Sequence, residues 1–129
     1  MIRIVIVRHG QTAWNIDGDQ GPRFRGTVDL PLSGQGVDQA KITAQRLATF
    51  SLETIYSSPL QRAASTAQII AAAYGQEPEL VPGLSSMNYG DWAGQTDTDL
   101  ERQWPDLYRQ WQANPFRVRA PGGESLVDL

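Results

Sequence analysis

The stretch Ile2-Arg3-Ile4-Val5-Ile6-Val7-Arg8-His9-Gly10 decides the fold class, because a short β-branched run leads directly into a charged turn. Residues 2–7 are almost entirely apolar, which is typical of an interior strand of a parallel sheet covered on both faces. Ligands of open α/β sheets bind just beyond the carboxyl ends of such strands, where Arg8, His9 and Gly10 fall. The stretch therefore predicts an α/β protein in which a buried strand positions a functional turn.

Each residue of this turn has a use if the ligand is a phosphate ester. Arg8 offers a planar fork of donors for two phosphate oxygens, and the His9 imidazole can attack phosphorus to give a phosphohistidine. Gly10 allows the backbone to approach an anion, while Thr12 and Asn15 add short side-chain donors. The alternative, a turn whose charged side chains are only solvated, stays open on these residues alone.

Length and composition restrict the class of protein. A chain of 129 residues suits one globular domain over residues 1–129. The sequence has no long apolar span and no signal-peptide pattern, and it has no cysteine, so we expect a cytoplasmic protein without a membrane segment or a disulfide. A net charge of −3 opposes nucleic-acid binding, so small molecules are the expected partners.

A loop and a helix are expected after the first turn. Residues 15–28 contain several glycines and a proline and predict a loop, in which Arg25 either reaches a substrate or is solvated. Ser33 is the expected N-cap of an amphipathic helix that ends near Phe50. Residues 34–36 resemble part of a dinucleotide fingerprint, but the third glycine and the preceding strand are missing, so we reject nucleotide binding.

The next segment supplies a second candidate phosphate ligand. Residues 53–56 predict a strand, and Pro59 lies near the first turn of a helix that ends at Gly75. Arg62 falls in that first turn, where free backbone N–H groups already favour an anion. It therefore either completes a phosphate clamp with Arg8 or is a solvated surface arginine.

The second half of the chain predicts further elements. Residues 79–81 read as a strand, Asp97 begins a helix that Pro105 interrupts, and residues 124–129 read as the start of an amphipathic helix. The aromatic side chains of this half form either a substrate lid or simple packing; they are Trp92, Trp104, Tyr108, Trp111 and Phe116.

The stretch from Arg8 to Asn15 resembles the signature of the histidine phosphatase superfamily, also called the phosphoglycerate mutase-like family. Further stretches are similar to this family in the same order, at residues 24–26, 29–33, 56–63, 66–67, 89–94 and 121–126. The resemblance implies a three-layer α/β/α fold with a mostly parallel central sheet, lacking its C-terminal strand and helices.

The resemblance also implies an activity. The family's chemistry would be phosphomonoester hydrolysis through phosphorylated His9, with Arg8 and Arg62 clamping the phosphate and Gly10, Thr12 and Asn15 supporting it. No metal and no cofactor are implied, because two arginines supply the positive charge that a metal would give. The expected partner is a small phosphorylated metabolite, and phosphatase and mutase activities stay open.

This chain departs from the family pattern at two positions that bear on this activity. Relatives commonly carry Glu or Asp where this chain has Ser86, and a hydroxyl is a poor general acid at neutral pH; Asp91 is either a substitute or a solvated loop carboxylate. His9 is the only histidine, so the family's second active-site histidine is missing. The alternatives are a catalytically impaired phosphate-binding relative and a truncated fragment, whose unpaired sheet edge would favour a homodimer.

Overall fold

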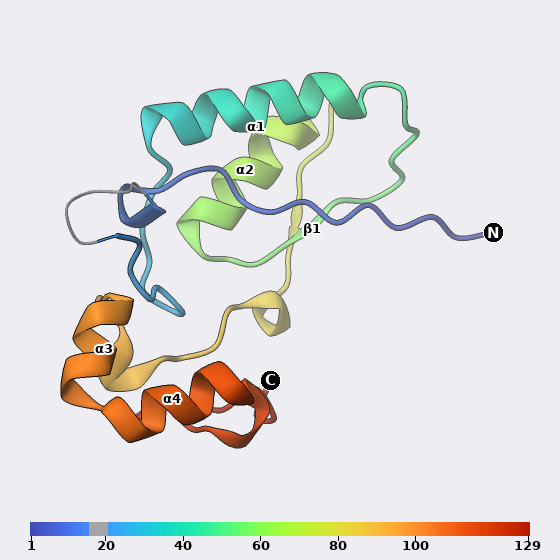
Figure 1. Ribbon diagram of the computed structural model, residues 1–129. Helices are drawn as coiled ribbons and strands as arrows, with labels where there is room; N and C mark the ends of the chain where they lie inside the picture. The colour runs from blue at the N-terminus through green and yellow to red at the C-terminus, as the bar shows by residue number, and fades with distance from the viewer. Residues whose placement is uncertain (16–20) are drawn as a thin grey trace. The chain divides into compact units, whose positions relative to one another are not determined.

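A computed structural model describes residues 1–15 and 21–129 and divides the chain into two compact units (Figure 1). Unit 1 comprises Met1–Thr12 and Leu30–Leu84, and unit 2 comprises Ala13–Asp29 and Ser85–Leu129. Residues 16–20 of the predicted loop lie outside the described residues. A single domain over residues 1–129 stays a prediction. None of the helices in the described ranges is long and apolar enough to span a bilayer.

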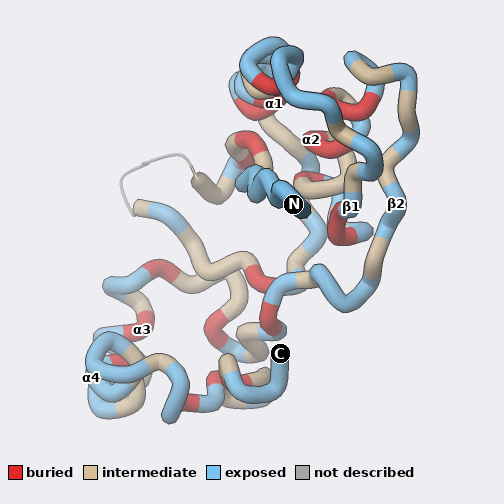
Figure 2. Tube along the Cα trace, turned by 90° about the vertical axis from the view of Figure 1, so that its right-hand side faces the viewer, coloured by how far each residue is buried: buried red, intermediate tan, exposed pale blue. Residues whose placement is uncertain are grey.

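Unit 1 alternates helices with two short parallel strands. Its elements are α1 (Gly34–Leu47), β1 (Tyr56–Ser57), α2 (Gln61–Ala72), β2 (Glu79–Leu80) and the 3-10 helix η2 (Pro82–Leu84). Tyr56 is in register with Glu79 in the parallel pair. Helix α2 contacts both α1 and β1, and Figures 1 and 2 show it between them.

Helix α1 begins after the predicted cap but ends at Leu47 rather than near Phe50, and α2 ends at Ala72, before the predicted stop at Gly75. The Ser33 hydroxyl accepts a hydrogen bond from the Gly36 N–H at 3.1 Å and so caps α1. Gly75 follows α2 with a φ of 64°, a conformation that favours glycine after a helix. A small core forms where Ala44 and Leu47 of α1 meet Ile70 of α2.

The N-terminal segment differs from its prediction. Residues 2–7 belong to neither strand of the described sheet, and the side of the segment that carries Ile2, Ile4 and Ile6 is 91%, 79% and 92% exposed (Figure 2). The expected buried interior strand is therefore wrong for this structure. Val5 and Val7 are more covered, at 37% and 38%. This alternation has the period of an extended chain, but residues 2–7 are all exposed and neither face is buried.

Unit 2 is built from short helices. They are the 3-10 helices η1 (Ala13–Asn15), η3 (Gly90–Trp92) and η4 (Pro115–Arg117) and the α-helices α3 (Asp97–Gln103) and α4 (Pro105–Ala113). Thr96 and Asp99 form a capping box at the start of α3. Pro105 occupies the first turn of α4, where its missing N–H costs nothing. The predicted helix start at Asp97 and the interruption at Pro105 are both confirmed.

Aromatic side chains form the core of unit 2. Trp92 is fully buried and packs edge-to-face against Trp111 and Tyr108, with ring centroids 5.6 and 6.2 Å apart. Packing rather than a lid therefore accounts for Trp92 and Tyr108. Phe116 is 64% exposed and lies outside this core.

The last residues do not form the predicted helix. Residues 124–129 contain turns and an isolated bridge between Arg119 and Ser125. Asp128 accepts hydrogen bonds from the Ser125 N–H at 2.7 Å and from its hydroxyl at 2.8 Å. Together with Arg119, these bonds hold the pKa of the Asp128 carboxyl at about 2. The Ser125 N–H and hydroxyl therefore bond to Asp128 in a turn rather than at the start of a helix.

The turn that carries His9 packs backbone against backbone on the first turn of α1. A Cβ atom added to Gly36 would overlap the Gln11 carbonyl oxygen and lie 2.8 Å from the Gln11 nitrogen, and one added to Gly10 would overlap the Gly36 carbonyl. The Ser33 N–H donates to the Gln11 carbonyl at 2.8 Å across the same contact. Both glycines are therefore needed for the helix to approach the turn this closely.

We expect Gly36→Ala to lower the free energy of unfolding by about 1–3 kcal/mol, because the backbone must shift to admit the new methyl group. Gly34→Ala is the matched control, since nothing lies within 4 Å of a Cβ at that position of the same helix. It should leave the stability unchanged or raise it by up to about 1 kcal/mol through helix propensity. Urea unfolding of both variants measures the difference, and equal stabilities would contradict the close contact.

Candidate functional site

The predicted site residues are divided between the two units. Unit 1 contains Arg8, His9, Gly10, Thr12 and Arg62. Asn15, Arg25 and Ser86 belong to unit 2. Each group is described within its own unit.

The His9 side chain is oriented by the backbone of its neighbour. His9 is half-buried, and its Nδ1 lies 2.7 Å from the Gly10 carbonyl oxygen. A carbonyl oxygen can only accept, so Nδ1 carries the proton of this hydrogen bond. In the neutral imidazole Nε2 then keeps its lone pair, which is the form needed for attack on phosphorus.

Arg62 is a buried cation in the first turn of α2. It is only 4% exposed, which rules out the alternative of a solvated surface arginine. The first turn of α2, all of which the structure describes, contains no acidic residue. The positive partial charge of the helix start therefore adds to the guanidinium charge, and this combination favours an anion.

Thr66 connects Arg62 to the His9 turn, a role that the sequence analysis did not assign. Its hydroxyl accepts a hydrogen bond from the Gly10 N–H at 3.1 Å and donates one to the Arg62 carbonyl at 2.7 Å. Thr66 is 5% exposed. Two signals in the sequence pointed to this residue: it lies in a stretch that resembles the family, and it follows Arg62 by four residues, one helical turn along α2.

The three remaining candidates in unit 1 have different environments. Arg8 is exposed. Thr12 is fully buried and forms an isolated antiparallel bridge with Leu32. The glycine at position 10 leaves room for the Gly36 backbone. Phosphate contacts by Arg8, Gly10 and Thr12 stay predictions.

In unit 2, the positive charge of Arg25 acts on the hydroxyl of Tyr89. The Arg25 guanidinium donates to the Trp14 carbonyl at 3.5 Å. Burial raises the pKa of the Tyr89 hydroxyl, and the positive charge of Arg25 partly offsets that rise. Asn15 is the last residue of η1, next to Trp14. The substrate contacts of Arg25 and Asn15 stay predictions.

Ser86 lies on an exposed loop whose next residues are fixed by Glu124. The Asn88 N–H donates to the Glu124 carboxylate and the Glu124 N–H donates to the Asn88 carbonyl, each at 2.8 Å. Ser86 itself is exposed, while Met87 is buried. Asp91 is also exposed, but it lies in η3 rather than in the expected loop.

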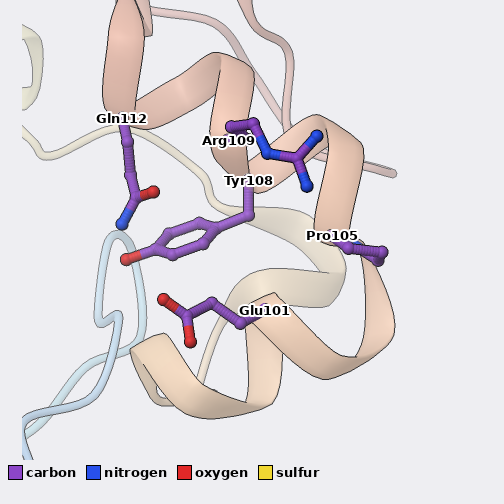
Figure 3. Close-up of a pocket in the computed structure, with 5 residues that line it drawn as sticks. All are labelled: Glu101, Pro105, Tyr108, Arg109 and Gln112. Carbon is purple, nitrogen blue, oxygen red and sulfur yellow. The ribbon is translucent and has the colours of Figure 1, made fainter.

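A cavity of about 270 Å³ lies on unit 2 (Figure 3). It is lined by Glu101 of α3 and by four residues of α4, namely Pro105, Tyr108, Arg109 and Gln112. The Tyr108 hydroxyl donates to Asp97 at 2.6 Å, and burial raises its pKa to about 12. None of the predicted site residues lines this cavity. Within the described ranges, no three His, Cys, Asp or Glu side chains are grouped to hold a metal ion.

Comparisons with known proteins agree with the sequence motifs. The family model of the histidine phosphatase superfamily (branch 1) matches residues 4–129. Phosphoserine phosphatase 1 of Hydrogenobacter thermophilus is 36% identical over all of this chain and 59% of its own length. A 2,3-bisphosphoglycerate-dependent phosphoglycerate mutase of Methylocella silvestris is 34% identical over 97% of this chain and 61% of its own length.

Solved structures give the same relationship. The crystal structure of the alpha-ribazole phosphatase from Shigella flexneri has a TM-score of 0.81 and 27% identity, covering 95% of this chain and 58% of that one. The chain thus spans between one half and two thirds of the length of these relatives.

Nitrogen NMR of the imidazole should show a proton on Nδ1 of His9 and none on Nε2. The measurement is made at a pH of about 8, above the ordinary histidine pKa of about 6.5, so that the ring is neutral. The spectrum needs no assignment because the chain has one histidine, and the urea-unfolded chain provides the reference. A proton on Nε2 in the folded chain would contradict the orientation by Gly10.

Proposed function

The chain belongs to the histidine phosphatase superfamily, and from this premise we propose that it hydrolyses phosphomonoesters through a phosphohistidine at His9. Its fold is the α/β fold of phosphoglycerate mutase-like proteins. The observation that carries the proposal is the 2.7 Å contact between His9 Nδ1 and the Gly10 carbonyl. This contact places the proton on Nδ1 and therefore the lone pair of the neutral ring on Nε2, the atom that attacks in the proposed mechanism.

The proposed reaction has two steps. In the first, the Nε2 lone pair attacks phosphorus, the bond from phosphorus to the ester oxygen breaks, and the leaving oxygen takes a proton from water. In the second, water attacks phosphorus, the bond between phosphorus and Nε2 breaks, and inorganic phosphate leaves while the neutral imidazole is restored. Arg8 and the buried Arg62 would hold the phosphoryl oxygens, whose negative charge they stabilise throughout, with Gly10, Thr12 and Asn15 in support.

The proposed substrate is a small phosphorylated metabolite. Relatives include a phosphoserine phosphatase and a glucosyl-3-phosphoglycerate phosphatase, which supports a phosphorylated small molecule as the class. Arg25 is the proposed contact for the rest of that molecule. We propose neither a metal nor a cofactor, and a cytoplasmic location rests on the sequence alone.

A second candidate function is phosphate binding without turnover. Two observations favour it: the chain has a single histidine, and an exposed serine stands at the position of the usual acid. Loss of one preorganised donor typically costs on the order of a hundredfold in rate. The two functions differ in turnover but share the buried Arg62.

Hydrolysis of an aryl phosphate separates these functions, because its phenolate leaves without help from a strong acid. We expect His9→Ala to reduce turnover to background, and Arg62→Lys to reduce it about tenfold or more because a lysine cannot form the bidentate contact. Arg46→Lys, an exposed arginine in the last turn of α1, is the matched control.

Turnover retained by His9→Ala would contradict the phosphohistidine mechanism. A wild-type chain that is stabilised against heat by inorganic phosphate but shows no turnover would establish the second candidate function. Circular dichroism of each variant confirms that it is folded before its rate is read.

We also propose a homodimer through residues 2–7. The exposed Ile2, Ile4 and Ile6 side chains support it, because an unpaired segment of strand-forming residues readily pairs with a second copy. We expect a dimer by light scattering that dissociates on dilution, and a monomer for Ile4→Lys. Ile42→Lys, at an exposed position of α1, is the control; equal masses for both variants would exclude this contact.

A further inference from the structure

We propose that Thr66 is a positioning residue that fixes the His9 nucleophile relative to Arg62. The inference rests on the proposed phosphatase function and adds a residue to it. Thr66 touches neither the phosphate nor His9 in this proposal. It acts through the Gly10 amide and the Arg62 carbonyl, to which its hydroxyl is bonded.

The hydrogen bonds form a continuous chain from the nucleophile to the clamp. His9 Nδ1 is held by the Gly10 carbonyl at 2.7 Å, and the Gly10 N–H is held by the Thr66 hydroxyl at 3.1 Å. That hydroxyl in turn donates to the Arg62 carbonyl at 2.7 Å. The orientation of the imidazole and the start of α2 are thereby coupled through one side chain.

Burial makes this coupling hard to replace. A hydroxyl has one hydrogen to donate, and here that hydrogen goes to Arg62 while a lone pair receives the Gly10 N–H. Gly10 and Thr66 are both buried. Water therefore cannot easily take over the Gly10 amide if the hydroxyl is removed, and the turn must shift to find another acceptor.

A second threonine shows which bond is specific to the site. Thr43 of α1 donates to the Gln39 carbonyl at 2.9 Å, the same bond to the residue four positions earlier that Thr66 makes. Threonine side chains commonly make this local bond within helices. The bond from Gly10, 56 residues away in sequence, is what gives Thr66 its proposed role, and Thr43 is a matched control for the local bond alone.

The experiment compares Thr66→Val, Thr66→Ser and Thr43→Val. Amide hydrogen exchange at Gly10 measures the strength of its hydrogen bond to Thr66 without any substrate. The kcat and KM for an aryl phosphate measure the effect of that bond on turnover. We expect Thr66→Val to speed exchange at Gly10 and to lower kcat by about ten- to a hundredfold, because small displacements of reacting groups cost this much. KM should change less, Thr66→Ser should restore both readouts, and Thr43→Val should match the wild type.

Three results would overturn the inference. They are unchanged Gly10 exchange in Thr66→Val, unchanged kcat despite faster exchange, and a Thr66→Ser variant as impaired as Thr66→Val. Thr66→Ala takes the place of Thr66→Val if the valine variant does not fold. If the wild-type chain shows no turnover, the proposed function and the role of Thr66 are both rejected. If the wild type is active and Thr66→Val has the same kcat, only the role of Thr66 is rejected.

Discussion

The close backbone contact between the Gly10–Gln11 turn and the first turn of α1 is the constraint on which the rest of unit 1 depends. Neither Gly10 nor Gly36 has space for a Cβ atom. The contact is reinforced by the Ser33 N–H, which bonds to the Gln11 carbonyl, and by the Gln39 side chain, which accepts the Gln11 N–H at 2.8 Å. A buried backbone needs such partners. The turn that carries His9 is thus fixed by the helix that follows it in sequence.

The second determinant of unit 1 is the placement of positive charge. The chain as a whole has a net charge of −3, yet Arg62 is buried at a helix start that lacks acidic neighbours in its first turn. A phosphate bound at this place would gain from both the guanidinium and the helix start.

The sequence predicted the features that local interactions determine. The cap at Ser33, the helix start at Asp97 and the break at Pro105 each depend on residues within one turn of the position concerned. The predicted burial of residues 2–7 was wrong. An apolar pattern indicates that a segment can be buried, but it does not indicate whether other elements of the chain pack against it. The bond between Gly10 and Thr66 joins residues far apart in sequence, so no local pattern contained it.

The exposed Ser86 bears on which phosphate esters the proposed activity suits. A general acid contributes most when the leaving oxygen is strongly basic, as in an alkyl phosphate, and least when the leaving group is already a stable anion. Asp91 is exposed in η3, and the proposed mechanism gives it no role. In the proposed mechanism, His9 and the buried Arg62 act on the phosphoryl group and not on the leaving oxygen. In the proposed mechanism, the described residues therefore assist the attack on phosphorus more than the departure of an alcohol. We expect esters with acidic leaving groups to be hydrolysed most readily.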